Sequence, residues 1–280
     1  MGDAFGERFF VHPDVVEQLI EQRAIPRSPW RTTDDTEMSL AIVDVLERHA
    51  LIDRDALAIE FARRYTAEIM RGYGGTAHKI LREIGLGRPW RDAAGEVFSG
   101  QGSMGNGGAM RAAPVGAYFA DDVPRVVAEA SASAEVTHAH PDGQAGAIAV
   151  ALAAAWAVRH GDGGGKAMLE FVAANTPSGP TLEGIVRAMA LDLDRTPQWA
   201  AHVLGSGKLV ISSDTVPFAL WCAARHLDSF EEAMWTTVAG LGDRDTTCAI
   251  VGGIVALAAG HASIPAEWLA ARESFVRSAS

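Results

Sequence analysis

Apolar residues recur along most of the chain at spacings of three and four, the repeat of an amphipathic helix. In residues 34–50 the repeat gathers five side chains on one face: Met38, Ile42, Val45, Leu46 and His49. In residues 54–70 it gathers Leu57, Phe61, Tyr65 and Ile69. The same pattern predicts further helices at about 123–136, 143–160, 165–175, 181–192, 214–227, 229–239 and 245–260.

Strand signals are nearly missing from the sequence. The β-like stretch KLVISS (208–213) is weakened by Pro217 soon after it. Glycine and proline clusters fall between the periodic segments, as expected for loops that join helices. No repeat of fixed period, coiled-coil heptad or low-complexity linker interrupts the chain. The pattern therefore predicts one all-α domain spanning residues 1–280.

Composition limits the function classes. Of the 280 residues, 48% are hydrophobic and 21% are charged, which is typical of a soluble globular protein. The net charge of −11, from 35 acidic and 24 basic residues, argues against a general electrostatic footprint for nucleic acid. An anionic ligand would instead bind through backbone N–H groups, helix termini or bound cations.

Cysteine usage and hydropathy favour a cytoplasmic protein. Cys222 and Cys248 both lie in apolar stretches and are predicted to be buried thiols, which fits a reducing compartment. The first ten residues lack a basic region followed by an apolar one, so they do not resemble a secretory signal. The longest apolar stretch, 145–158, is shorter than the ~20 residues that a membrane span needs. We expect no membrane association, and no stable partner is evident.

Two predicted helix starts carry more acid than a helix cap requires. Asp34 and Asp35, flanked by Thr33 and Thr36, run directly into the first amphipathic helix. One acid suffices to cap a helix, and hard divalent cations prefer such oxygen ligands. A capping cluster remains the alternative for this segment taken alone.

The second acidic start precedes residues 248–259, which are almost wholly apolar. A helix that is apolar on every side lies in the centre of a fold, so Asp243, Asp245 and Thr246 at its start are predicted to be buried. Carboxylates in such a place need partners. Two Asp/Asp/Thr helix starts in one chain favour a shared metal cluster, whose four carboxylates could neutralise two divalent ions.

Within residues 99–116, five glycines crowd the part that precedes the helix-prone stretch 109–116: Gly100, Gly102, Gly105, Gly107 and Gly108. Glycine lets backbone N–H groups turn toward a ligand, and a helix start favours anions. This segment therefore indicates a diphosphate cradle, with a flexible loop as the alternative. For Arg111, which follows it, we expect an ion pair with one of the carboxylates.

Other motifs are weaker. His138 and His140 could be ligands, but no cysteine or third histidine is near them, so we predict hydrogen bonding to a ligand or carboxylate rather than zinc binding. A phosphate loop is rejected at residues 160–168 because Lys166 follows a predicted helix and precedes Ala167. The stretch GSGKLV (205–210) fails for similar reasons.

Five segments, GDAFG, TDDTEM, GSMGNGGAMRAAPVG, VTHAHPDGQAGA and GDRDTTCAIVGG, occur in the order seen in the ADP-ribosylglycohydrolase family. The chain resembles that family from residue 2 to about residue 260. The resemblance implies an all-α orthogonal bundle with a dinuclear Mg²⁺ or Mn²⁺ site in a central cleft. The implied metal ligands are Thr33, Asp34, Asp35, Asp243, Asp245 and Thr246. The implied diphosphate-binding residues are Gly102, Ser103, Met104, Gly105, Asn106 and Gly107, with His138 beside them.

The resemblance also implies an activity, the hydrolysis of the glycosidic bond between ADP-ribose and an acceptor. Two divalent ions would hold the distal ribose and a water, and Asp34 or Asp243 would take the proton of that water. A non-catalytic ADP-ribose binder and a metal-dependent phosphoester hydrolase are the competing hypotheses.

Two departures from the family pattern concern the N-terminal segment. Relatives commonly carry a further helical stretch before GDA, whereas Met1 directly precedes Gly2 here. Serine-type relatives place a glutamate where this chain has Phe10, and the nearest acid is Glu7. The acceptor therefore stays open among arginine, another protein side chain, a nucleic-acid base and a small molecule. The role of Arg244, facing outward or bracing its loop, is open as well.

Overall fold

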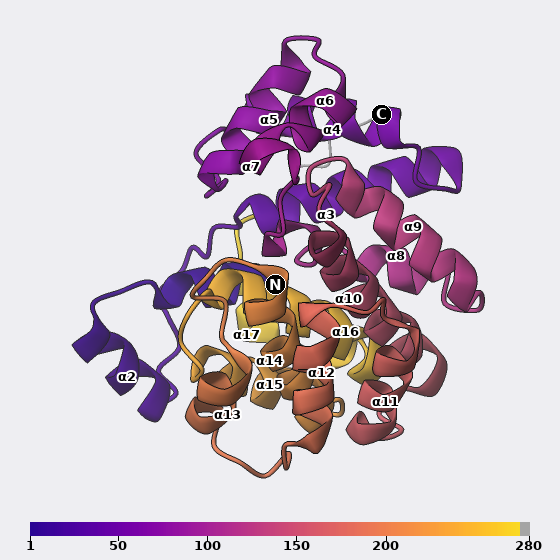
Figure 1. The fold of residues 1–280 in the computed structure, drawn as a ribbon. Helices are drawn as coiled ribbons and strands as arrows, with labels where there is room; N and C mark the ends of the chain where they lie inside the picture. Colours follow the sequence, from indigo (N-terminus) through magenta and orange to yellow (C-terminus); the bar gives the residue numbers. More distant parts are fainter. Residues whose placement is uncertain (275–280) are drawn as a thin grey trace.

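The computed structural model describes residues 1–274, and its regular structure is helical throughout (Figure 1). Within that range, two isolated β-bridges join Trp30 to Arg272 and Gly105 to Ile211, and no strand forms. The prediction of an all-α fold is confirmed. No helix in the described part combines the length and apolar character that a membrane crossing requires.

The described residues form seventeen α-helices and three short 3₁₀ turns, labelled η. The first half contains α1 (Gly2–Gly6), η1 (Glu7–Phe9), α2 (Pro13–Glu21), α3 (Asp34–His49), α4 (Arg54–Ala67), α5 (Gly75–Gly85), α6 (Trp90–Gly95), α7 (Val97–Gly100), η2 (Asn106–Gly108), α8 (Ala113–Tyr118) and α9 (Val123–Glu135). The second half contains α10 (Pro141–His160), α11 (Gly165–Asn175), α12 (Pro180–Ala190), α13 (Pro197–Leu204), α14 (Ser212–Arg225), α15 (Phe230–Val238), α16 (Arg244–Ala259), η3 (His261–Ser263) and α17 (Ala266–Ala271).

Every helix predicted from periodicity forms, with ends that shift by at most three residues. Two members of the predicted apolar stripes do not belong to the core. His49, in the last turn of α3, is exposed, and Ile69 lies beyond the end of α4 with 49% of its surface exposed. The predicted burial of Cys222 and Cys248 is confirmed.

Helix α10 lies in the centre of the molecule because its side chains are small. Its residues from 145 to 157 are all buried, and most of them are alanine. Alanine favours the helix and lets neighbouring helices approach closely. Helices α8, α9, α11, α14 and α16 all pack against α10. In Figure 1, α4 to α7 lie at the top of the view, with α3 between them and the larger body below.

An aromatic cluster joins the two ends of the chain. Phe5 of α1 stacks on Trp268 of α17 with ring centroids 4.4 Å apart. Trp30 and Trp235 meet the ring of Phe5 edge-on, at 5.7 and 5.1 Å. Since buried aromatic rings carry large apolar surfaces, this cluster holds α1 in place against the body of the protein.

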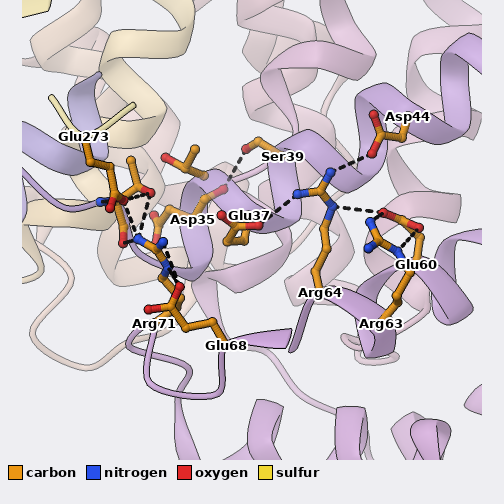
Figure 2. Close-up of polar contacts among 12 residues, drawn as sticks. Asp35, Glu37, Ser39, Asp44, Glu60, Arg63, Arg64, Glu68, Arg71 and Glu273 are labelled. Carbon is orange, nitrogen blue, oxygen red and sulfur yellow. Dashed lines mark hydrogen bonds and ion pairs between the residues drawn. The ribbon is translucent and has the colours of Figure 1, made fainter. Parts of the chain in front are cut away.

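The C-terminal segment fixes the backbone that leads into α3. Trp30 donates its N–H to the Ala271 carbonyl (2.8 Å), and Glu273 donates its N–H to the Trp30 carbonyl (3.0 Å). The Glu273 carboxylate accepts from the Thr32 N–H at 2.7 Å and forms an ion pair with Arg71, as Figure 2 shows. The C-terminal segment therefore fixes the position at which α3 begins.

A second charged network joins α3 to α4 (Figure 2). Glu60, which is almost fully buried, accepts hydrogen bonds from Arg63 at 2.6 and 2.9 Å and from Arg64 at 3.0 Å. Arg64 also binds Glu37 at 2.8 Å and Asp44 at 2.6 Å on α3. Burial alone would raise the pKa of Glu60, but the hydrogen bonds and charges of the two arginines outweigh it and lower that pKa.

Helix α1 lies directly against the first turns of α16. A Cβ atom on Gly6 would stand 2.1 Å from the backbone oxygen of Arg244, and one on Gly2 would stand 1.9 Å from that of Cys248. Only glycine permits this approach. The contact brings Asp3 of α1 to the acidic start of α16.

We expect the Gly6→Ala variant to lose about 3 kcal/mol of unfolding free energy, because its methyl group forces the α1 and α16 backbones apart. Urea unfolding measures the loss. Gly75→Ala is the matched control, since Gly75 also lies in a helix and a Cβ there would meet nothing within 4 Å. It should change the free energy by less than about 1 kcal/mol. Equal effects of the two changes would contradict the close contact.

We expect Glu60→Gln to lower the free energy of unfolding by about 1 kcal/mol at pH 7, because the charged network between α3 and α4 is broken. A lowered pKa in the folded state stabilises above the ordinary value of 4.5. The difference from the parent should therefore be complete above that pH and shrink as the pH falls below it. Unfolding curves between pH 7 and pH 4 test this, with the exposed Glu17→Gln as control.

Candidate functional site

The two predicted acidic segments meet in the folded chain. Asp34 and Asp35 open α3, while Asp243 and Asp245 lie at the start of α16. The two pairs are close enough for charge repulsion: Asp245 raises the pKa of Asp35, and Asp243 raises the pKa of Asp34. Asp3 of α1 adds a fifth carboxylate to the group. We call these five side chains the acidic cluster.

Neither of the predicted aspartates of α3 caps its helix. Thr33 is the N-cap residue, and its hydroxyl accepts from the Asp35 N–H at 3.3 Å. Asp3 supports this cap from α1, because its carboxylate accepts from the N–H and the hydroxyl of Thr33, both at 2.9 Å. The capping alternative is therefore confirmed in one form, with Thr33 as the cap and Asp34 and Asp35 in the first turn of α3. Their carboxylates are left for another use.

The start of α16 uses its aspartates in a similar way. Asp243 is the N-cap residue, yet its side chain makes no capping hydrogen bond. Its Oδ2 accepts instead from Nδ2 of Asn106 at 2.7 Å. Its backbone N–H donates to the Ser206 carbonyl at 3.0 Å, and a Cβ on Gly207 would stand 2.5 Å from the Asp243 Cβ. Asp243 is therefore held at its side chain by the glycine loop and at its backbone by the loop of Ser206 and Gly207.

Mutual repulsion shapes the electrostatics of the acidic cluster. Burial, followed by the charge of Asp3, raises the pKa of Asp34 to about 7. Burial and the charge of Asp245 raise the pKa of Asp35 far above its ordinary value. Burial and the neighbouring Asp243 do the same to the pKa of Asp245. Without further positive charge, the cluster resists full ionisation.

The acidic cluster fits divalent cations by its chemistry. The Oδ1 atoms of Asp35 and Asp245 are buried and have no hydrogen-bond partner within the described residues. Carboxylate and hydroxyl oxygens are the ligands of hard cations such as Mg²⁺ and Mn²⁺. In the described part of the chain, however, no three His, Cys, Asp or Glu side chains form a ready-made metal-binding group. The fit therefore lies in charge and donor type, not in preformed coordination.

The predicted glycine loop lies beside the acidic cluster. Asn106 links the two, because its Nδ2 donates to Oδ2 of Asp243 at 2.7 Å. The same Nδ2 donates to the Thr215 hydroxyl of α14 at 3.1 Å. Ser212 anchors the loop from α14, donating its N–H to the Met104 carbonyl and its hydroxyl to the Gly105 carbonyl, both at 3.0 Å. These hydrogen bonds fix the loop to α14 and to Asp243, which contradicts the alternative of a freely flexible segment.

His138 lies against the same loop. A Cβ atom on Gly105 or Gly107 would stand 3.1 or 3.2 Å from its Nε2 atom. Nδ1 of His138 shares a 2.7 Å hydrogen bond with the Thr137 hydroxyl. His140, by contrast, caps α10, since its Nδ1 accepts from the Asp142 N–H. The two histidines thus have separate roles.

The predicted ion pair of Arg111 with a carboxylate is wrong. Its guanidinium is fully buried and donates to the Ser133 carbonyl (3.1 Å) and the Thr137 hydroxyl (2.8 Å). It also lies over the Phe61 ring, 4.4 Å from the centroid. Burial lowers the pKa of Arg111 to about 9, and the charge of Asp34 partly opposes this. The guanidinium therefore stays charged at neutral pH.

Arg244 braces the N-terminal segment. Its guanidinium lies over the ring of Phe10, 4.4 Å from the centroid, and its Nε is buried without a hydrogen-bond partner among the described residues. Burial, followed by the charge of Asp3, raises the pKa of Glu7. The nearby charge of Arg244 lowers that pKa and the charge of Asp243 raises it. Phe10, which stands where serine-type relatives are expected to have a glutamate, thus lies with its ring beneath the Arg244 guanidinium.

A cavity of about 400 Å³ borders the acidic cluster at Asp3 and Asp35. Its walls are mainly apolar and include Met110, Leu40 and Leu257. None of the predicted diphosphate-binding residues lines it. This cavity therefore does not coincide with the predicted ADP-ribose site.

Three supporting residues escaped the sequence analysis. Asp3 is one of them, although an acid directly after Gly2 and before Ala4 and Phe5 is itself a signal. In sequence, Ser206 and Gly207 stand out only as part of a rejected phosphate loop, whereas in the folded chain they pack on Asp243. Their contacts join segments far apart in sequence, and no local pattern encodes them.

Comparisons with known proteins find similar sequences and structures that match nearly the whole chain. A family model described as ADP-ribosylglycohydrolase matches residues 1–278. The ADP-ribosylhydrolase ARH3 of Mus musculus is 28% identical over 324 residues, covering 98% of this chain and 85% of that protein. An uncharacterized protein of Archaeoglobus fulgidus is 32% identical over 239 residues, covering 85% and 74%. A solved structure described as an ADP-ribosylglycohydrolase-related protein complex has a TM-score of 0.66 at 25% identity, covering 97% of this chain and 88% of its own.

The acidic cluster predicts a stability effect that depends on cations. With a chelator present, Asp245→Asn should stabilise the fold by about 1 kcal/mol and raise the melting temperature by a few degrees. The reason is that the parent must keep this carboxyl protonated or bury its charge beside other carboxylates, whereas asparagine carries no charge. Added Mg²⁺ or Mn²⁺ should stabilise the parent strongly and this variant weakly. Differential scanning calorimetry measures both responses.

Asp142→Asn is the matched control, since Asp142 is a buried aspartate at the start of α10 that accepts from the Thr181 N–H at 3.0 Å. It should leave the response to cations unchanged. An equal response of the parent and Asp245→Asn to both metals would rule out cation binding at the acidic cluster.

Proposed function

Because the chain belongs to the ADP-ribosylglycohydrolase family, we propose that it hydrolyses the glycosidic bond between ADP-ribose and an acceptor, with two divalent cations at the acidic cluster. The observation that carries this proposal is the convergence of Asp34, Asp35, Asp243 and Asp245. None of these carboxylates makes a capping hydrogen bond or an ion pair among the described residues. Asp34 and Asp35 are buried, whereas Asp243 and Asp245, which we expected to be buried, are half-buried.

The proposed ligands of the cations are the oxygens of the two helix starts: Thr33, Asp34, Asp35, Asp243, Asp245 and Thr246. The unpartnered oxygens of Asp35 and Asp245 support this assignment. Mg²⁺ or Mn²⁺ is the expected ion for an all-oxygen donor set. When bound, such ions offset negative charge and polarise the oxygens of a bound sugar and water.

The diphosphate is proposed to bind at the glycine loop, through the segment Gly102, Ser103, Met104, Gly105, Asn106 and Gly107, with His138 beside it. Backbone N–H groups at a helix start bind anions without a cationic side chain. That property suits a chain with a net charge of −11. The anchoring of the loop by Ser212 supports a prepared site.

The proposed reaction joins the oxygen of a water to C1″ of the distal ribose and breaks the bond from C1″ to the acceptor. One proton of the water goes to a carboxylate, and the departing acceptor takes up one proton in return, so the protein gains and loses no net proton. Asp34 is the better base, because its carboxylate takes no hydrogen bond from another side chain in the described residues. Asp243 is held by Asn106 and is better suited to position the reacting groups.

The acceptor is proposed to belong to a protein, a nucleic acid or a small molecule that carries ADP-ribose. The curated relatives named ADP-ribosylhydrolase support this substrate class. Where the resemblance gives serine-type relatives a glutamate, this chain has Phe10 under Arg244. At this position the chain therefore has an aromatic ring beneath a guanidinium in place of a carboxylate.

We expect Asp34→Asn and Asp243→Ala to lower the rate of ADP-ribose release at least about a hundredfold, because a base or its positioning group is lost. The assay uses a panel of linkages to arginine, serine, a nucleic-acid base and an O-acetyl group, with Mg²⁺, Mn²⁺ or chelator. Glu17→Gln, on the exposed face of α2, should keep the parent rate.

The outcomes of this assay separate the hypotheses. Parent-level turnover in both aspartate variants would reject the site. Calorimetric binding of ADP-ribose without turnover on any linkage would favour a non-catalytic binder. Release of products other than intact ADP-ribose would favour phosphoester cleavage.

A further inference from the structure

A chain of three side chains leads from the protein interior to the glycine loop. Nη2 of Arg111 lies 2.8 Å from the Thr137 hydroxyl, which lies 2.7 Å from Nδ1 of His138. Arg111 and Thr137 are almost completely shielded from solvent, and His138 is 9% exposed. No other side chain bonds the Thr137 hydroxyl within the described residues.

The direction of the hydrogen bonds in this chain follows from the donors available. An arginine guanidinium can only donate, so the Thr137 oxygen accepts from Arg111. The hydroxyl hydrogen of Thr137 then needs an acceptor, and Nδ1 of His138 is the acceptor within reach. If Nδ1 carried a proton instead, a buried hydroxyl hydrogen would be left unpaired, which is unfavourable. The proton of the neutral imidazole therefore belongs on Nε2.

The Nε2 atom faces the glycine loop. Ideal Cβ atoms on Gly105 and Gly107 would stand 3.1 and 3.2 Å from it, closer than side chains normally approach. Nε2 makes no hydrogen bond within the described residues, and it is not among the buried polar atoms that lack a partner. An N–H donor that solvent can reach thus points at the loop.

We propose that Arg111 and Thr137 are positioning residues that hold His138 in the neutral tautomer with its proton on Nε2, as a fixed hydrogen-bond donor to an anionic group in the glycine loop. The identity of that anion as the diphosphate of ADP-ribose rests on the proposed function. The tautomer itself depends only on the contacts of the three side chains.

The surrounding charge favours the same state. Burial, followed by the charge of Arg111, lowers the pKa of His138 to about 3, so the ring stays neutral in the physiological range. Arg111 keeps its proton at neutral pH, because the pKa of the guanidinium is lowered only to about 9. A neutral ring can donate its one N–H to an anion, and, unlike an imidazolium, it carries no charge that would attract it to the acidic cluster.

The test replaces Thr137 by valine, which keeps the shape of the side chain and removes the hydroxyl. ¹⁵N NMR of histidine-labelled full-length protein reports the tautomer, with the His138 signals assigned through His138→Gln. We expect the Nε2–H tautomer alone in the parent and a substantial Nδ1–H population in Thr137→Val. Thr137→Ser keeps the hydroxyl and should keep the parent spectrum.

Binding of ADP-ribose gives the second measurement. Isothermal titration calorimetry with Mg²⁺ should show about tenfold weaker affinity for Thr137→Val, the effect of one impaired hydrogen bond to a charged group, and parent affinity for Thr137→Ser. Melting temperatures confirm that both variants are folded. A purely structural role would alter the melting temperature without moving the tautomer.

Two results would overturn the proposed positioning role. One is an Nδ1–H tautomer in the parent, and the other is an unchanged Nε2–H tautomer in Thr137→Val. Failure of the proposed function gives a different pattern. In that case the tautomer shifts as expected, but the parent protein itself does not bind ADP-ribose.

Discussion

Repulsion among buried carboxylates is the constraint on which the arrangement of this protein depends. Asp34, Asp35 and Asp245 lie where burial and neighbouring negative charge both raise their pKa values. Such a cluster forms only because other contacts hold the helix starts together. The glycine contacts of α1 on α16 and the aromatic cluster around Phe5 supply that support. Stability gained in the core thus maintains an unfavourable centre, as in many functional sites.

The support is distributed so that the carboxylates stay available. Thr33, backed by Asp3, takes over the capping of α3, and Asn106 rather than a cation binds Asp243. Asn106 also belongs to the glycine loop, so one amide joins the acidic cluster to the proposed anion site. In the proposed reaction this link fixes the distance between the two halves of the substrate. Rigid positioning of that kind can supply a large share of a rate acceleration.

The helices were predictable because their signal is local. Apolar periodicity predicts α3, α4 and α9 to α12 within a few residues, and the apolar run 248–259 of α16 marks a central helix. The meeting of the two acidic segments was also predictable, since both carry more acid than a cap uses. The roles of Asp3, Ser206 and Gly207 were not, because contacts between distant segments create them. The wrong stripe member Ile69 shows the same limit, since the end of α4 is set by its surroundings.

The failed expectation for Arg111 explains how the charges are arranged. An arginine near several aspartates is expected to pair with one of them, yet Arg111 donates to Thr137 and Ser133. An ion pair there would occupy the oxygens that the proposed cations need. With its guanidinium kept off those oxygens, Arg111 still exerts an electrostatic effect on Asp34. The fixed positive charge of Arg111 contacts the histidine side of the site, and in the proposed function the acidic cluster is neutralised by cations that can bind and leave.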